Sequence, residues 1–156
     1  MDKIKWCFEQ SRGIEIIAPN SGLSEAYLNK AEKSLKSLRE ETDQDWKITK
    51  SYYTMYFSLY AVLMKIGIKS EIHSCTIEFM QRYLSEYFND SDFQLFESAF
   101  KSRVDMQYYT DRVVDKKTLD ALTRNVHFFM SKCKELAHKL KEDKIKEIRE
   151  KLKKFV

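Results

Sequence analysis

One stretch of the sequence is far more apolar than the rest. Between Lys50 and Lys65 the chain reads SYYTMYFSLYAVLM, without a charged side chain, although 33% of all residues are charged. At helical spacing its large apolar residues form two stripes. A column of small residues lies between the stripes: Ser51, Thr54, Ser58 and Ala61. Both stripes must be covered, so we predict a central helix that begins near Trp46 and ends at Gly67, which suits a left-handed C-cap.

The segments on either side show the pattern of amphipathic helices. Ser24 is the expected N-cap of an outer helix over residues 24–41, and a third helix begins near His73. The polar connector NDSD at 89–92 precedes a fourth helix, and a fifth runs from about residue 118 to 140. The sequence therefore predicts an all-α bundle of about five helices in a single domain, 1–156. It would have an N-terminal arm, a core at about 24–140 and a basic helical tail at 141–156.

Composition supports long helices and limits the chemistry. One proline and three glycines leave few helix breakers, and the net charge of +4 permits a polyanionic partner without requiring one. Cys7, Cys75 and Cys133 are odd in number and far apart, so we expect reduced thiols. No segment has the pattern of a signal peptide or a membrane span, which predicts a cytoplasmic protein without membrane contact.

Arg103 is the most unusual residue of the apolar pattern. It continues a helical stripe that begins with Phe93, Phe96 and Phe100. A guanidinium in that position needs an acid, a route to the surface or an anion. The residues one turn away are not acidic, so a salt bridge would have to come from another helix. A structural role and an anion-binding role both stay open.

The other candidate site residues can each have a structural role instead of a functional one. Tyr108 and Tyr109 either pack or contact a bound nucleotide, and His73 either bonds nearby backbone or supplies an imidazole. Glu135 and His138 form one ExxH pair, but a di-metal site in a helical bundle needs a second pair and two more carboxylates. We expect neither a metal nor a cofactor.

Several segments together resemble the HEPN family of small helical proteins. They are AYLNKAEKSL, then WKITKSYYTMYFSLYAVLMKIGI, then KSEIH, then a helix with Arg103 and Tyr108. The central run is similar to the family's SYYAMFHAARALLLxxG pattern, and the start WCFEQSRGIEIIAPN is similar to archaeal members. The resemblance implies an antiparallel bundle that forms a homodimer, with the signature arginine of each subunit at a cleft between subunits. Catalytic members are metal-independent RNases, often toxins paired with a minimal nucleotidyltransferase, and others are scaffolds or nucleotide-binding partners.

The chain departs from the catalytic members at one position. Their arginine is followed within a few residues by a histidine, whereas Arg103 is followed by VDMQYYTDR. Tyr108 and Tyr109 lie in that window, and a phenol with a pKa near 10 is a poor base at neutral pH. Our first hypothesis is a nucleotide- or RNA-phosphate-binding partner in a nucleotidyltransferase-linked, toxin–antitoxin-like system, with a degenerate RNase motif. The alternatives are a divergent RNase that uses Arg103, His73 and Tyr108, and a helical scaffold without a ligand.

Overall fold

The protein is described from a computed structural model of residues 1–156, and seven α-helices dominate it. The helices are α1 (Lys3–Glu9), α2 (Ser21–Glu40), α3 (Gln44–Ile66), α4 (His73–Tyr83), α5 (Asp90–Tyr108), α6 (Lys116–Lys139) and α7 (Glu142–Leu152). Two short strands, β1 (Ile14–Ile16) and β2 (Ile68–Ser70), and a final 3₁₀ turn (Lys153–Phe155) complete the chain. The predicted all-α class is confirmed.

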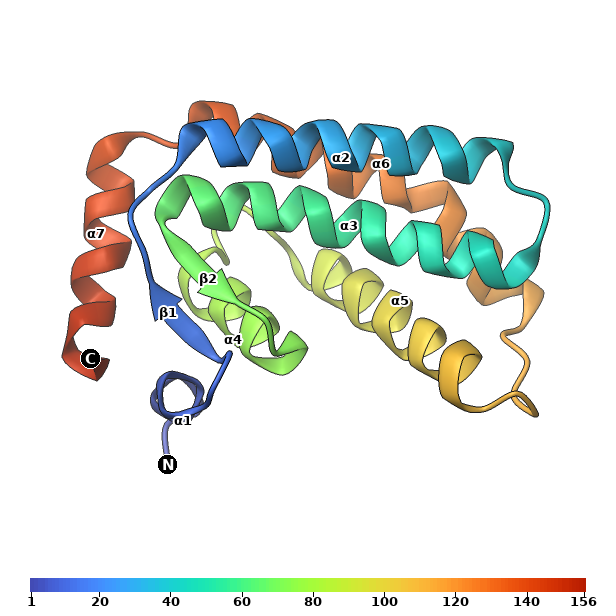
Figure 1. The fold of residues 1–156 in the computed structure, drawn as a ribbon, viewed down its shortest axis with the longest axis horizontal. Helices are drawn as coiled ribbons and strands as arrows, with labels where there is room; N and C mark the ends of the chain where they lie inside the picture. The colour runs from blue at the N-terminus through green and yellow to red at the C-terminus, as the bar shows by residue number, and fades with distance from the viewer.

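The long helices form an antiparallel bundle around α3. Successive long helices α2, α3, α5 and α6 alternate in direction, and α1, the two strands and α7 gather at one end (Figure 1). The strands pair antiparallel, with Ile14 opposite Ser70 and Ile16 opposite Ile68. The hydrophobic pattern of the sequence did not predict this sheet. A strand of three residues is too short to show the alternation of apolar and polar residues that identifies strands in a sequence.

The central helix ends as its pattern predicts. Asp43 caps the N-terminus by accepting a hydrogen bond from the Trp46 amide, and Gly67 ends the helix with φ 87°. A Cβ at Gly67 would collide with the carbonyl oxygen of Ile17, so this position requires glycine for space as well as for φ. The small-residue column of α3 is fully buried.

The predicted start of the outer helix is wrong. Asn20, not Ser24, is the N-cap of α2, and its side chain accepts a hydrogen bond from the Leu23 amide. Ser24 lies inside the helix, where its hydroxyl donates to the carbonyl oxygen of Ala61 at 2.7 Å. The short serine at this point and the small column of α3 let the two helices approach closely.

The connection between α4 and α5 is longer than the sequence pattern indicates. Apolar residues continue at helical spacing as far as Phe88, but α4 ends at Tyr83. Leu84 and Phe88 are nevertheless buried, because the turn that follows α4 folds back onto the core. Asn89 then caps α5 in a capping box with Asp92, so the helix begins at Asp90, inside the polar connector that was expected to precede it.

The C-terminal segment turns away from α6 and packs across the end of the bundle. The backbone leaves the helix at Leu140, and α7 buries Ile145, Ile148 and Leu152 (Figure 1). Arg149 donates from one nitrogen to three carbonyl oxygens, those of Ile17 (2.7 Å), Gly67 (3.1 Å) and Ile66 (3.2 Å). The tail therefore closes the C-terminal end of α3.

The expectation of three reduced thiols is wrong in this structure. Cys7 and Cys75 form a disulfide that joins α1 to α4, and Cys133 alone is a free thiol, fully buried. The two bonded cysteines are separated by 68 residues in the sequence. They meet because α1 packs on α4, which is a contact that spacing along the chain cannot reveal.

Candidate anion-binding site

The guanidinium of Arg103 lies among tyrosines and has no acidic partner. One of its nitrogens donates to the Tyr53 hydroxyl at 3.3 Å, and its central carbon lies 5.2 Å from the ring centre of Tyr52 and 5.4 Å from that of Tyr53. No carboxylate in the chain lies within ion-pair distance of it, and the side chain is half-buried. A cation held by aromatic rings and one phenol keeps most of its donors free for an anion.

His73 lies close by, at the start of α4. Its ring stacks on Phe100 with centres 3.7 Å apart, and Nδ1 lies 3.4 Å from the Tyr52 hydroxyl. Nε2 lies 3.5 Å from a carboxylate oxygen of Glu97, without the alignment of a hydrogen bond. Burial, and after it the charge of Arg103, lowers the pKa of His73 from 6.5 to about 4. The imidazole is therefore neutral at physiological pH.

Tyr52 connects the arginine to the histidine. It presents its ring to Arg103 and its hydroxyl to His73, and it stacks on Phe96 in the core with ring centres 5.8 Å apart. Burial raises the pKa of Tyr52 to about 12, and burial also raises the pKa of Glu97. A cluster from α3, α4 and α5 thus places the Arg103 guanidinium beside the Tyr52 and Tyr53 hydroxyls and the His73 imidazole, with the half-exposed carboxyl group of Glu97 next to the histidine.

Tyr108 and Tyr109 lie away from this cluster, at the end of α5. Tyr108 is 67% exposed, and Tyr109 packs under the guanidinium of Arg112, which lies 3.8 Å from the ring centre. Arg112 also pairs with Asp105 at 2.9 Å. Neither tyrosine hydrogen-bonds Arg103 or His73. Within one chain, the structure brings Arg103 and His73 together and leaves both tyrosines outside the cluster.

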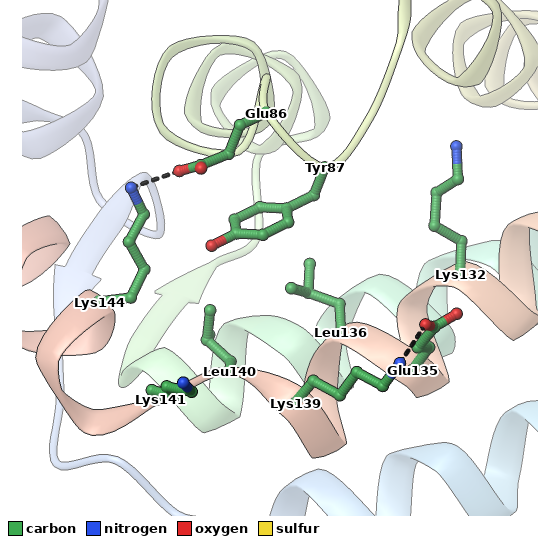
Figure 2. A pocket seen from close by; sticks show the side chains of 9 residues that line it. All are labelled: Glu86, Tyr87, Lys132, Glu135, Leu136, Lys139, Leu140, Lys141 and Lys144. Carbon is green, nitrogen blue, oxygen red and sulfur yellow. Dashed lines mark hydrogen bonds and ion pairs between the residues drawn. The ribbon is translucent and has the colours of Figure 1, made fainter.

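A cavity lies beside the C-terminal end of α6, and Figure 2 shows the side chains that line it. It measures about 520 Å³, and its apolar floor comes from Tyr87, Leu136 and Leu140. Lysines surround it, but carboxylates in or beside the cavity already pair with several of them. Those pairs are Lys144 with Glu86, Lys139 with Glu135, and Lys132 with Asp92. Its net positive field is correspondingly weak.

The residues of the ExxH pair are engaged elsewhere on the surface. Glu135 pairs with Lys139 at 2.6 Å, and Nε2 of His138 lies 2.6 Å from Glu25 on α2. No three histidine, cysteine or acidic side chains are grouped as a metal ion would need. None of the helices combines the length and the apolar character needed to cross a bilayer.

Comparison with known proteins identifies the family of this bundle. The HEPN domain model matches residues 24–136, which is most of the chain. The chain belongs to the HEPN family. The matched range contains both His73 and Arg103 and stops just before α7.

The chain is also similar to a named archaeal protein. The chain is 27% identical over 117 residues to the protein named "Putative toxin MJ0142" from Methanocaldococcus jannaschii, an alignment that covers 70% of this chain and 78% of that protein. The family assignment rests on the domain match.

The sequence pattern did not reveal the partners of the two candidate site residues, Arg103 and His73. Tyr52, Tyr53 and Glu97 were not singled out, although both tyrosines lie in the uncharged run and Glu97 lies between two phenylalanines of the Arg103 stripe. A tyrosine-rich segment without charges was the only signal available. Which of its hydroxyls faces the arginine depends on how α3 and α5 pack.

Proposed function

We propose that this HEPN protein binds RNA or nucleotide phosphate through Arg103 as one half of a toxin–antitoxin-like pair. The observation that carries the proposal is the half-buried guanidinium of Arg103, which hydrogen-bonds only the Tyr53 hydroxyl. Guanidinium groups bind phosphate oxygens in pairs of parallel hydrogen bonds, and a site with low water content strengthens such bonds. The name of the archaeal relative supports the toxin-like assignment.

Binding is favoured over strand cleavage because of the state of His73. A general base works best with a pKa near the working pH, whereas the pKa of His73 is lowered to about 4. Its ring is also covered by Phe100, so a ribose hydroxyl has little access to it. A divergent RNase that uses Arg103, His73 and Tyr108 remains the second candidate, since His73 is unprotonated and lies near the arginine.

The proposed assembly is a homodimer with a minimal nucleotidyltransferase as partner. In such a dimer the two Arg103 side chains would face a shared cleft, and Tyr108 and Tyr109, at the end of α5, are exposed for contacts within it. Light scattering on the purified chain tests the dimer, and a mass equal to one chain contradicts it. Copurification with the product of a neighbouring nucleotidyltransferase gene tests the partner.

Phosphate binding is tested with a single substitution and a matched control. Arg103→Gln removes the charge and keeps a polar side chain, while Arg124→Gln removes an exposed arginine of α6 that has no ion pair. Arg103→Gln should weaken the binding of fluorescent single-stranded RNA about tenfold or more, the cost of one charge-assisted contact. Arg124→Gln should bind like the natural protein.

Cleavage is tested on the same proteins by incubating a cellular RNA pool in the presence of a chelator. Intact RNA in all samples, together with loss of binding in Arg103→Gln, supports the binding function. Cleavage that Arg103→Gln abolishes would replace it with the RNase. Equal binding by Arg103→Gln and the natural protein would show that Arg103 is not the phosphate site, and the absence of both binding and cleavage would support the scaffold.

A further inference from the structure

A row of three aromatic rings crosses the seam between α2 and α3. Phe57 lies between Tyr53 and Tyr27, with ring centres 5.6 Å from the first and 6.1 Å from the second. The ring planes are inclined by only 28° and 29°. All three side chains are half-buried, so each leaves part of its ring surface to solvent. The row is thus a partly open apolar strip that fixed helices hold in place.

Lysines line the two hollows beside this strip. A groove of about 410 Å³ is lined by Lys30, Lys33, Lys50, Tyr53 and Phe57 with two serines, and an adjoining hollow of about 380 Å³ shares Lys30 and Lys33 and adds Tyr27. Nζ of Lys30 lies 4.9 Å from the ring centre of Phe57.

The charge along this strip is mainly uncompensated. Lys50 is balanced by Glu41 at 2.6 Å, but Lys30 and Lys33 form no ion pair. No carboxylate lines either hollow, in contrast to the cavity of Figure 2, which contains Glu86 and Glu135. A molecule that fills the strip therefore meets two free positive charges.

The strip is continuous with the Arg103 cluster through one residue. Tyr53 lines the lysine groove with its ring and accepts the hydrogen bond of Arg103 with its hydroxyl, at 3.3 Å. A chain of phosphates bound at Arg103 would therefore have its next positive charges at the lysines. Flat groups between those phosphates would meet Tyr53, Phe57 and Tyr27.

We infer that Tyr27, Lys30, Lys33, Tyr53 and Phe57 form a track for single-stranded RNA that leads to Arg103. This inference rests on the proposed function, because it extends the same phosphate site. Interleaved cations and half-open rings match a strand whose phosphates and unpaired bases are both accessible. A duplex hides its bases in the stack and could use only the lysines. A protein partner would have to bring acidic side chains to Lys30 and Lys33.

The test measures binding of a labelled single-stranded RNA of about 12 nucleotides, and of the same strand in a duplex, by fluorescence anisotropy. The track variants are the pair Lys30→Ala with Lys33→Ala, and separately Phe57→Leu, which keeps every charge. The control pair is Lys141→Ala with Lys146→Ala, two exposed lysines of the tail that also form no ion pair. Circular dichroism and light scattering check the fold and the mass of each variant.

The track predicts a specific set of changes. The Lys30 and Lys33 pair should lower affinity for the single strand at least tenfold and reduce the slope of log affinity against log salt by about 1.4, the value for two lost phosphate contacts. Phe57→Leu should lower affinity at least fivefold with the salt slope unchanged, since stacking is not screened by salt. The control pair should stay within about twofold of the natural protein, and the duplex should bind more weakly than the single strand.

Other outcomes overturn the track, and they separate it from the proposed function. If Arg103→Gln weakens binding while the track variants match the control pair, the phosphate site at Arg103 is supported and the track is refuted. If the natural protein binds no RNA, the track is refuted together with the RNA-binding form of the proposed function. Equal binding of duplex and single strand refutes the role of the rings. A changed mass in solution for the Lys30 and Lys33 pair would assign this face to contacts between copies of the chain.

Discussion

Replacing His73 with phenylalanine should remove an acid-sensitive term from the stability of the protein. In the folded chain the pKa of His73 is lowered from 6.5 to about 4 by burial and by Arg103. As the pH falls below about 6.5, His73 becomes protonated in the unfolded chain, whereas in the folded chain it stays unprotonated until about pH 4. The contribution of His73 to the free energy of unfolding is therefore fully present above pH 6.5 and is lost as the pH falls toward 4. Below pH 4 this contribution changes no further.

The size of the effect follows from the shift. Each unit of pKa difference is worth about 1.4 kcal/mol, so the natural protein should lose about 2 to 3 kcal/mol relative to His73→Phe between about pH 7.5 and pH 4.5. Phenylalanine can keep the stack on Phe100, whose ring centre lies 3.7 Å from that of His73. The difference between the two proteins should consequently be small at the higher pH.

The assay is urea unfolding followed by circular dichroism across this pH range. The free energies of unfolding of the two proteins should converge near neutral pH and separate in acid, with the variant more stable. Ionisable groups far from position 73 contribute the same change to both proteins and cancel in the difference. Parallel pH curves would refute the buried, neutral imidazole. An NMR titration of His73 in Arg103→Gln should show a higher pKa than in the natural protein, because the second cause of the shift is gone.

Two further predictions concern stability. Cys7→Ser should reduce the free energy of unfolding by about 4 kcal/mol, the chain-entropy value for a loop of 68 residues, and reductant should then have no effect on the variant. Equal urea midpoints for oxidised and reduced natural protein would show that this disulfide does not stabilise the fold. Arg149→Met should cost about 2 kcal/mol, because the Ile17, Ile66 and Gly67 carbonyls lose a charged donor at the end of α3. A thermal midpoint like that of Lys146→Met, an exposed position on the same helix, would contradict it.

The sequence by itself determined most of the helical framework. The uncharged run indicated α3 as the covered central helix, and Gly67 marked its end through local backbone chemistry. The helix predicted from about residue 118 to 140 matches α6, and the leucines at positions 119, 122 and 136 on its inner face are buried. These features depend on residues within a few positions of each other, so periodicity and capping preferences are enough to predict them.

The tertiary structure alone decided the surroundings of the candidate site. Arg103 was identifiable as an odd cation on an apolar stripe, but its neighbours Tyr52 and Tyr53 come from a helix 50 residues earlier in the chain. The pairing of Cys7 with Cys75, the strand pair and the inward serine of α2 are contacts of the same long-range kind. Each depends on the angle and register at which two helices pack. Those quantities are set by the whole core at once, and no local pattern encodes them.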